Sequence, residues 1–212
     1  MGYRRGTATA YARVMRRPFM QDPAQIDALT GQQYLVLRPT TAVASLYREV
    51  QDASLARLGA GVPHPHTEHV TLRGFVEPER REKLGALLAE WAAQQHPITV
   101  SAEAIDSFPA PWQILVVRLA RTPSLVAAYA SLTTALERTD LRRLEERTLD
   151  DWTFHLSVVY DSSLAAAEWA AFERAACCAV ALPPTEVIDE VELVWYQDGV
   201  EHAEVLPLGT RA

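Results

Sequence analysis

Two short segments of the sequence combine a titratable ring with a hydroxyl at the same spacing. The first reads HVTL from His69, with Thr71 as its hydroxyl residue, and the second reads HLSV from His155, with Ser157 in the same place. In a strand, side chains alternate between faces, so the histidine and the hydroxyl of each segment share one face. Imidazole titrates near neutral pH, so one histidine can remove a proton while the other donates one. Hydroxyls can donate hydrogen bonds to oxygens on which negative charge develops.

This residue set is suited to phosphoryl transfer without a metal. We expect His69 and His155 to be the catalytic acid and base, and Thr71 and Ser157 to bind the phosphate. A single such tetrapeptide is weak evidence, because chance matches are common. Two of them at equivalent points of a repeat are much stronger evidence.

The elements around the two motifs occur in the same order twice. β-rich runs, turn residues and apolar periodicity predict strand, helix, strand, helix, strand in each half of the chain. The first half has strands at 33–38, 69–75 and 98–105 and helices at 43–58 and 78–95; the second has strands at 112–119, 151–160 and 187–196 and helices at 123–138 and 164–180. A turn at Asp198-Gly199 leads to a last strand at 202–206. An internal duplication explains this order, and its two units, packed together, would form two lobes around a shared cleft.

The predicted organisation is an N-terminal basic arm, 1–32, followed by one bilobal domain, 33–212. Lobe one covers about 33–108 and lobe two about 109–208, with a Pro-containing junction at 106–111. The arm carries five arginines within residues 1–20 and no acidic residue there: Arg4, Arg5, Arg13, Arg16 and Arg17. Such a leader suits a transit peptide or an arm that touches nucleic acid, but a terminus packed or frayed on the surface is the commoner case.

Composition excludes several classes of protein. The chain is 49% hydrophobic and 22% charged, which is typical of a soluble globular domain and not of a disordered chain. A net charge of −7 argues against a protein that neutralises many phosphates of a long nucleic acid, although a small or terminal phosphate remains compatible. No window approaches the roughly 20 apolar residues of a membrane span, so we expect a cytoplasmic protein without a membrane partner. Cys177 and Cys178 are adjacent in a predicted helix and are expected to be small buried hydrophobes.

Four further residues are candidates for substrate binding. Strand alternation puts Arg73 on the face of His69, where its guanidinium would bind phosphate, with an exposed strand end as the alternative. Arg38 and Arg118 lie at matching strand ends and are candidates for the cleft rim, or for ordinary solvated charges. Tyr34 is a candidate for stacking on a base, or for core packing.

A cluster of ligand-type side chains precedes the first motif. His64, His66, Glu68 and His69 are of the kinds that bind zinc and other transition metals. Prolines at 63 and 65 indicate an extended loop rather than a helix that would hold the ligands in place. We therefore expect loop histidines at the cleft mouth and no metal, with a metalloenzyme as the alternative.

The paired motifs resemble the signature of the 2H phosphoesterase superfamily, which is two His-x-(Thr/Ser)-hydrophobic segments. This superfamily includes the 2′-5′ RNA ligase-like proteins and cyclic nucleotide phosphodiesterases, and the resemblance covers roughly residues 33–208. It implies an α+β fold of two pseudo-symmetric lobes, with largely antiparallel sheets, helices outside and a central cleft. It also assigns His69, Thr71, His155 and Ser157 to the active site.

The resemblance further implies what the protein acts on. The expected substrate is a nucleotide or RNA 3′-end that carries a 2′,3′-cyclic phosphate or a 2′-5′ linkage, acted on by a monomer without a cofactor. The alternative within the same resemblance is a nucleotide- or RNA-end-binding protein that keeps the pocket and turns over slowly or not at all.

Overall fold

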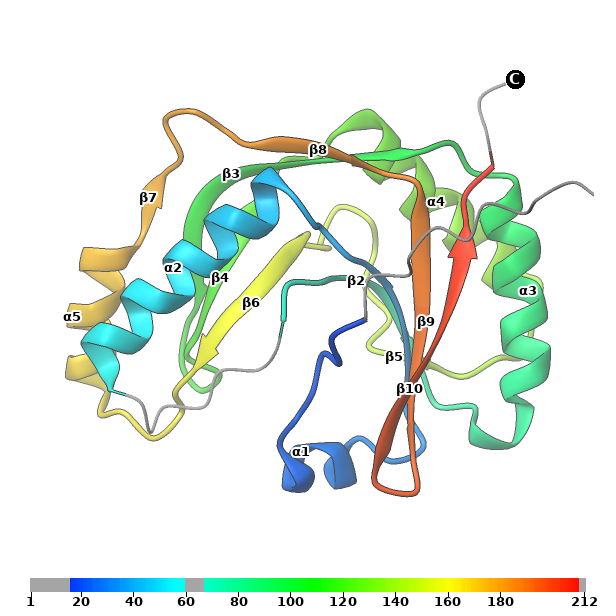
Figure 1. The fold of residues 1–212 in the computed structure, drawn as a ribbon, viewed down its shortest axis with the longest axis horizontal. Helices are drawn as coiled ribbons and strands as arrows, with labels where there is room; N and C mark the ends of the chain where they lie inside the picture. Colours follow the sequence, from blue (N-terminus) through cyan, green and yellow to red (C-terminus); the bar gives the residue numbers. More distant parts are fainter. Residues whose placement is uncertain (1–15, 60–66, 210–212) are drawn as a thin grey trace, which may run out of the picture.

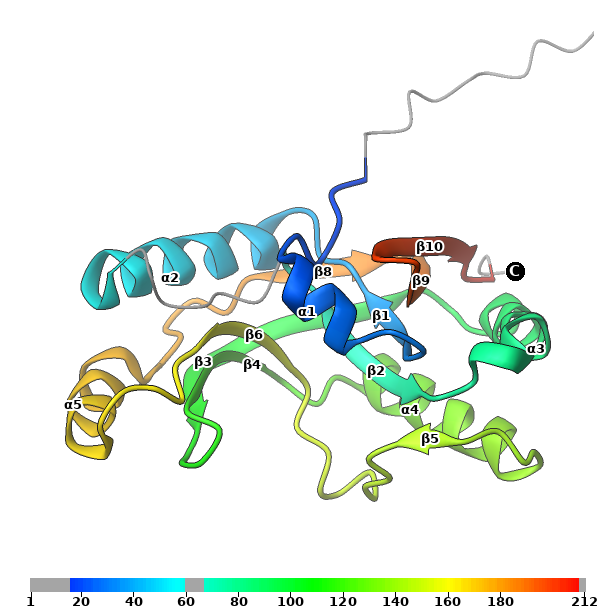
Figure 2. The ribbon, with the colours of Figure 1, turned by 90° about the horizontal axis from the view of Figure 1, so that it is seen from below.

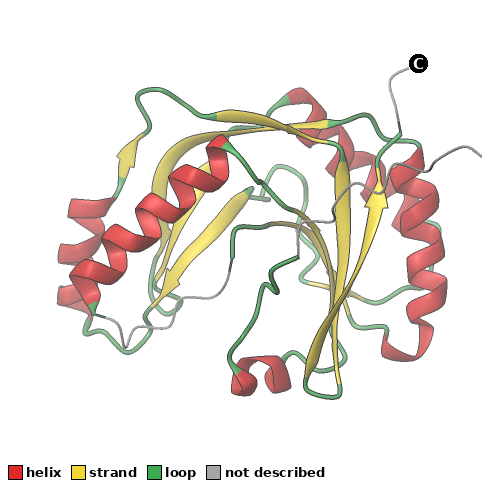
Figure 3. Ribbon diagram, viewed as in Figure 1, coloured by secondary structure: helices red, strands yellow, loops and turns green. Residues whose placement is uncertain are grey.

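The computed structural model describes residues 16–59 and 67–209, and its helices lie around two sheets (Figures 1 and 3). The helices are α1 (Pro23–Ala28), α2 (Ala42–Leu58), the 3-10 turn η1 (Pro78–Arg80), α3 (Arg81–Ala93), α4 (Pro123–Glu137) and α5 (Ala166–Ala176). The strands are β1 (Gln33–Leu37), β2 (Val70–Phe75), β3 (Ile98–Phe108), β4 (Ile114–Leu119), β5 (Arg143–Leu144), β6 (His155–Tyr160), β7 (Cys178–Ala179), β8 (Thr185–Ile188), β9 (Glu190–Gln197) and β10 (Val200–Pro207). Among the described residues, no helix is long and apolar enough to cross a membrane.

The strands form two open sheets in which every pairing is antiparallel. The first sheet has the order β10-β9-β1-β2-β5 and the second has the order β6-β4-β3-β7, with β8 paired to the start of β3. α3 and α4 lie at the end of the molecule that carries β9 and β10, while α2 and α5 lie at the other end (Figures 1 and 2). This is the predicted α+β arrangement of two antiparallel lobes with helices outside.

The two halves of the chain exchange elements, which the predicted lobe boundaries did not include. β3 closes the first half but pairs with β4 of the second, and β9, from the second half, pairs with β1. Helices cross over as well: Gln51 of α2 donates to the carbonyl of Val158 in β6, and Thr133 of α4 accepts from Arg73 in β2. One continuous apolar core runs through both lobes. The lobes are therefore interleaved in sequence rather than divided near residue 108.

Most predicted elements lie where the sequence placed them, with shifts of a few residues at their ends. Asp198 and Gly199 both adopt positive φ at the β9–β10 turn, as a tight hairpin requires. The prediction for the cysteines was wrong. α5 ends at Ala176, Cys177 is half-buried, and Cys178 is exposed on β7, because the chain leaves the helix there to pair with the edge of β3.

The described part of the N-terminal region is packed on the first sheet. Phe19, Met20 and Ile26 are buried in a small apolar cluster with Val36 and Val194. Asp22 caps α1 by accepting from the backbone N–H of Gln25, and a proline at the first helical position fits the same signal. Residues 16–32 are thus a structured wall on the face of β1 and β9. The arginines at 4, 5 and 13 lie outside the described residues.

Candidate active site

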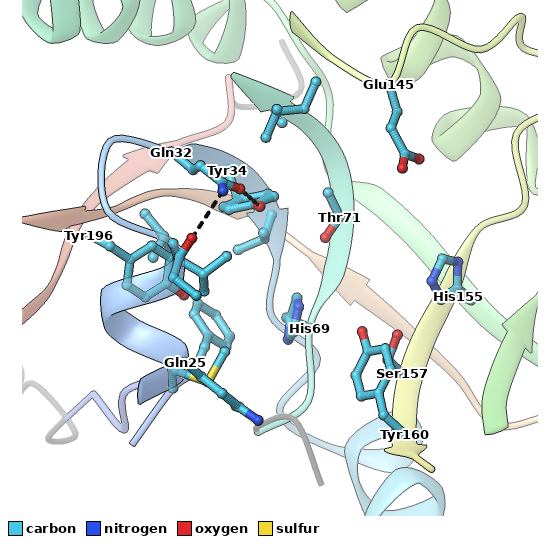
Figure 4. Close-up of a pocket in the computed structure, with 18 of the residues that line it drawn as sticks. Gln25, Gln32, Tyr34, His69, Thr71, Glu145, His155, Ser157, Tyr160 and Tyr196 are labelled. Carbon is cyan, nitrogen blue, oxygen red and sulfur yellow. Dashed lines mark hydrogen bonds between the residues drawn. The ribbon is translucent and has the colours of Figure 1, made fainter. Parts of the chain in front are cut away.

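A cavity of about 620 Å³ lies between the two sheets, and both motifs open into it (Figure 4). His69 directly precedes β2 and Thr71 lies in it, while His155 and Ser157 come from β6 on the opposite side. The remaining lining residues are Phe19, Met20, Gln25, Ala28, Leu29, Gln32, Tyr34, Val36, Gly74, Leu144, Glu145, Trp152, Tyr160, Val194 and Tyr196. The structure therefore brings the four sequence-predicted residues of the motifs to one pocket.

Both histidines are held by the same backbone hydrogen bond. Nδ1 of His69 is 3.0 Å from the carbonyl oxygen of Thr67, and Nδ1 of His155 is 2.8 Å from that of Thr153. A carbonyl can only accept, so Nδ1 carries the proton in each ring. In the neutral ring Nε2 then has the lone pair, and in the charged ring Nε2 has the second proton. Each imidazole is thereby set to exchange a proton through Nε2.

Each ring also packs against a phenylalanine. Phe19 lies 4.8 Å from His69 between ring centroids, and Phe108 lies 4.9 Å from His155. Phe108 belongs to β3, whereas Phe19 belongs to the N-terminal wall. The ring contacts and the Nδ1 hydrogen bonds together restrict how each imidazole can rotate.

Burial lowers the pKa of both histidines, because a low-dielectric environment disfavours the charged ring. For His69 burial is the main cause and the Arg38 and His155 charges add to it, partly opposed by the hydrogen bond to Thr67 and the Glu192 charge, and the pKa falls to about 4. For His155 burial also lowers the pKa, partly opposed by the hydrogen bond to Thr153. Without a bound anion, both rings are therefore neutral at pH 7.

A β-bulge in each motif strand determines which later residues face the cavity. In β2, Leu35 pairs with Arg73 and Val36 pairs with Thr71, so Leu72 is an extra residue. In β6, Leu115 of β4 pairs with Val159 and Val116 pairs with Ser157, so Val158, the fourth residue of the motif, is likewise an extra residue. Beyond each bulge the alternation is reversed. The residue five positions after each histidine, Gly74 or Tyr160, then lines the cavity.

The bulge at Leu72 is the reason that the Arg73 prediction was wrong. Simple alternation puts Arg73 on the side of Thr71, but the extra residue turns it to the opposite face. There its side chain is buried, donates to Thr133 Oγ1 at 2.7 Å and lies 4.4 Å from the ring centroid of Tyr129. Arg73 thus fills the core beneath α4 and does not line the cavity.

The other three substrate-binding candidates have different positions. Arg38 is largely buried beside the pocket, where it donates to both carboxylate oxygens of Glu192. Arg118 is outside the cavity, 40% exposed in its side chain, and pairs with Glu103 and Asp106 at 2.8 and 2.5 Å. Tyr34 does line the cavity, and burial raises its pKa to about 12.

Sequence reasoning missed Tyr160 and the N-terminal wall. Tyr160 accompanies Ser157 in the cavity (Figure 4). The bulge that exposes Tyr160 to the cavity has no signature in a single sequence. The wall did have one, since the Asp-Pro pair at 22–23 is a typical helix start, and the apolar Phe19 and Met20 precede it.

The described part of the chain offers no set of side chains for a metal site. In residues 16–59 and 67–209 no group of three or more His, Cys, Asp or Glu side chains is arranged to hold a metal ion. His64 and His66 lie outside these ranges. His69 is engaged through Nδ1 with a backbone carbonyl and faces His155 across the cavity.

Two antiparallel lobes with one His-x-(Thr/Ser) motif each, facing across a shared cavity, define a two-histidine class of protein. The model of the 2′-5′ RNA ligase superfamily matches residues 39–200, and the chain belongs to this family. No curated protein matches the sequence.

Solved structures show the same fold at low sequence identity. The protein TT0787 of Thermus thermophilus is 16% identical, with a TM-score of 0.63 over 85% of this chain and 100% of that one. E. coli LigT, solved in complex with NADP+, is 17% identical, with a TM-score of 0.53 over 86% of this chain and 99% of that one. LigT in complex with 3′-AMP is 15% identical, with a TM-score of 0.53 over 83% of this chain and 95% of that one.

Proposed function

We propose that this protein is a metal-independent phosphodiesterase that acts on a 2′,3′-cyclic phosphate or a 2′-5′ phosphodiester of a nucleotide or RNA end. The observation that carries the proposal is the matched pair of imidazoles, each held through Nδ1 and each accompanied by a hydroxyl on the same side of one cavity. The LigT complex with 3′-AMP supports a nucleotide as the ligand of this fold.

In the proposed reaction one neutral histidine takes a proton from water or from a ribose hydroxyl, and the oxygen of that water or hydroxyl bonds to phosphorus. The bond from phosphorus to the leaving ribose oxygen breaks, and the other histidine, in its charged form, gives that oxygen a proton. Thr71 and Ser157 donate to the nonbridging oxygens, where negative charge increases in the transition state. The anionic substrate supplies the negative charge that favours one protonated imidazole in a site where burial otherwise disfavours it.

The test compares three histidine variants on a panel of nucleoside 2′,3′-cyclic phosphates and 2′-5′ dinucleotides. We expect His69→Ala and His155→Ala each to lower kcat by about 10²-fold or more, the usual contribution of a general acid or base. His96→Ala is the matched control, because His96 is exposed and does not line the cavity. EDTA should not change the rate.

Full activity in either motif variant would refute the two-histidine mechanism. Loss of activity with EDTA that added metal restores would favour the metalloenzyme instead. Tight binding of these ligands by the wild-type chain without turnover would support the alternative of a nucleotide-binding protein.

A further inference from the structure

The N-terminal wall, residues 16–32, contributes to the cavity although it precedes the family match at 39–200. Six of its side chains line the cavity: Phe19, Met20, Gln25, Ala28, Leu29 and Gln32. In Figure 4 Gln25 and Gln32 lie on the side of the cavity that also holds Tyr34 and Tyr196, next to His69. One side of the candidate site is thus built from a segment outside the matched region.

Two carboxylates fix this wall to the first sheet. Glu201 accepts from the backbone N–H groups of Phe19 and Met20, both at 2.9 Å, and pairs with Arg16 at 2.8 Å. Glu192 pairs with Arg16 at 2.6 Å and with Arg38 at 2.5 Å. Both carboxylates are almost fully buried, so these charge-assisted hydrogen bonds act where water competes little.

Phe19 lies at the centre of this arrangement. The guanidinium of Arg38 lies 3.6 Å from its ring centroid and that of Arg16 lies 4.9 Å away, while His69 packs against the ring at 4.8 Å. The wall therefore supplies the ring that packs against His69, as β3 supplies Phe108 against His155. The orientation of one catalytic candidate depends on the docked wall.

The chemistry of the space beside the wall indicates the kind of group that it takes. Met20, Leu29, Val36 and Val194 give an apolar lining, Tyr34 and Tyr196 add aromatic rings, and Gln25 and Gln32 add amides. No lysine or arginine is among the described residues that line the cavity, and Arg16 and Arg38 are paired with Glu192. Such a lining suits an uncharged aromatic group with hydrogen-bonding edges and disfavours additional phosphates.

We propose that residues 16–32 form the subsite for the nucleobase of the substrate, and that Phe19 positions His69 for catalysis. This inference rests on the proposed function. A cavity of about 620 Å³ is within the usual range for a ligand of nucleotide size. Stacking of one base on aromatic side chains typically gives about 10-fold or more in affinity.

The first experiment separates the base from the phosphate. The substrates are a nucleoside 2′,3′-cyclic phosphate and methyl riboside 2′,3′-cyclic phosphate, which has the reacting group without a base. We expect the wild-type chain to prefer the nucleotide about 10-fold or more in kcat/KM. Ala28→Trp, which fills the subsite, should remove this preference by raising KM for the nucleotide alone. Ala24→Trp is the matched control on the same helix, since Ala24 is exposed and does not line the cavity.

The second experiment tests the positioning of His69. Phe19→Ala should lower kcat on both substrates by about 10-fold or more, because the His69 imidazole loses the ring that restricts its orientation in both reactions. It should also raise the pKa of His69, followed by NMR, from about 4 toward its ordinary value, because the packed ring no longer excludes water. Phe19→Leu, which keeps an apolar group against the imidazole, should recover most of both properties.

Equal loss on both substrates in Ala28→Trp, or no preference for the base in the wild-type chain, would overturn the subsite. An unchanged kcat and His69 titration in Phe19→Ala would overturn the positioning role. If the wild-type chain cleaves neither of these substrates nor the 2′-5′ dinucleotides, the proposed function fails, and calorimetry still tests the subsite independently. In that measurement nucleoside 3′-monophosphate must bind about 10-fold or more tighter than ribose phosphate, and Ala28→Trp must abolish the difference.

Discussion

The two histidines share a hydrogen-bond pattern but not an electrostatic environment, and from this difference we expect them to have different roles. Burial lowers the pKa of both, but only His69 also has a cation, Arg38, among the causes. A pKa of about 4 instead of 6.5 corresponds to a roughly 300-fold weaker affinity for the proton. At pH 7 about one His69 ring in 10³ is then charged in the free protein. Because Arg38 further disfavours the charged form of His69 and no cation is among the causes for His155, we expect His69 to be the base and His155 the acid in the cleavage direction.

The perturbation that tests this assignment is a change of leaving group. A nucleoside leaving group needs a proton as it departs, whereas p-nitrophenolate departs as an anion. On a 2′-5′ dinucleotide we expect His155→Ala to lower kcat by about 10³-fold, within the range of general acid catalysis. On the corresponding nucleoside 2′-(p-nitrophenyl phosphate) the decrease in kcat caused by His155→Ala should be only about 10-fold or less. His69→Ala should lower kcat by about 10³-fold on both substrates, because the attacking hydroxyl is the same in both reactions.

The assay is steady-state kinetics of both variants on both substrates at one pH between 6 and 8. The opposite pattern, in which His69→Ala is restored by the p-nitrophenyl ester and His155→Ala is not, would refute the assignment. Equal restoration of both variants would refute the reasoning from the Arg38 charge.

Three further predictions concern the hydroxyls, the strand glycine and acid stability. Thr71→Val and Ser157→Ala should each lower kcat by about 10²-fold with little change in melting temperature, since each removes one donor to the developing charge. Gly74→Ala should cost about 1 kcal/mol in chemical denaturation, because its Cβ would lie 3.1 Å from Leu144 side-chain atoms. Because the folded pKa of His69 is below 6.5, its contribution to stability is full above pH 6.5 and is lost as the pH falls toward 4. Across that window the melting temperature of His69→Gln should fall less than that of the wild-type chain, and an equal fall would contradict the lowered pKa.

Local patterns predicted the longer helices and strands, because each of these has a local cause, but α1, β5 and β7 were not predicted. Turn residues and apolar periodicity place α2, β2, α3 and α4 within a few residues of their observed bounds. The exchange of β3 and β9 between the halves was not predictable in this way, because strand pairing depends on contacts between residues far apart in the chain. Leu35 of β1 pairs with Leu193 of β9, and nothing near either residue specifies that partner.

The candidate site was predictable to the extent that alternation holds. His69 and Thr71 precede the bulge in β2, so two-residue alternation placed both on the cavity face. Arg73 follows the bulge, and the same rule then gave the wrong face. The N-terminal wall was missed for a different reason: charge dominated the interpretation of residues 1–20, whereas Phe19 and Met20 determine how the segment packs.

The two bulges also explain how a repeated motif makes an asymmetric site. Each bulge turns the residue five places after the histidine into the cavity, and these equivalent residues are Gly74 and Tyr160. On the β2 side the glycine has no side chain and lies close to Leu144 and Tyr34, whereas on the β6 side a phenol occupies the equivalent position. The two motifs are thus equivalent, but the residues that accompany them on the two strands are not. The N-terminal wall lies on the His69 side of the cavity, so we expect the repeat to supply the acid and base and its departures from symmetry to orient the substrate between them.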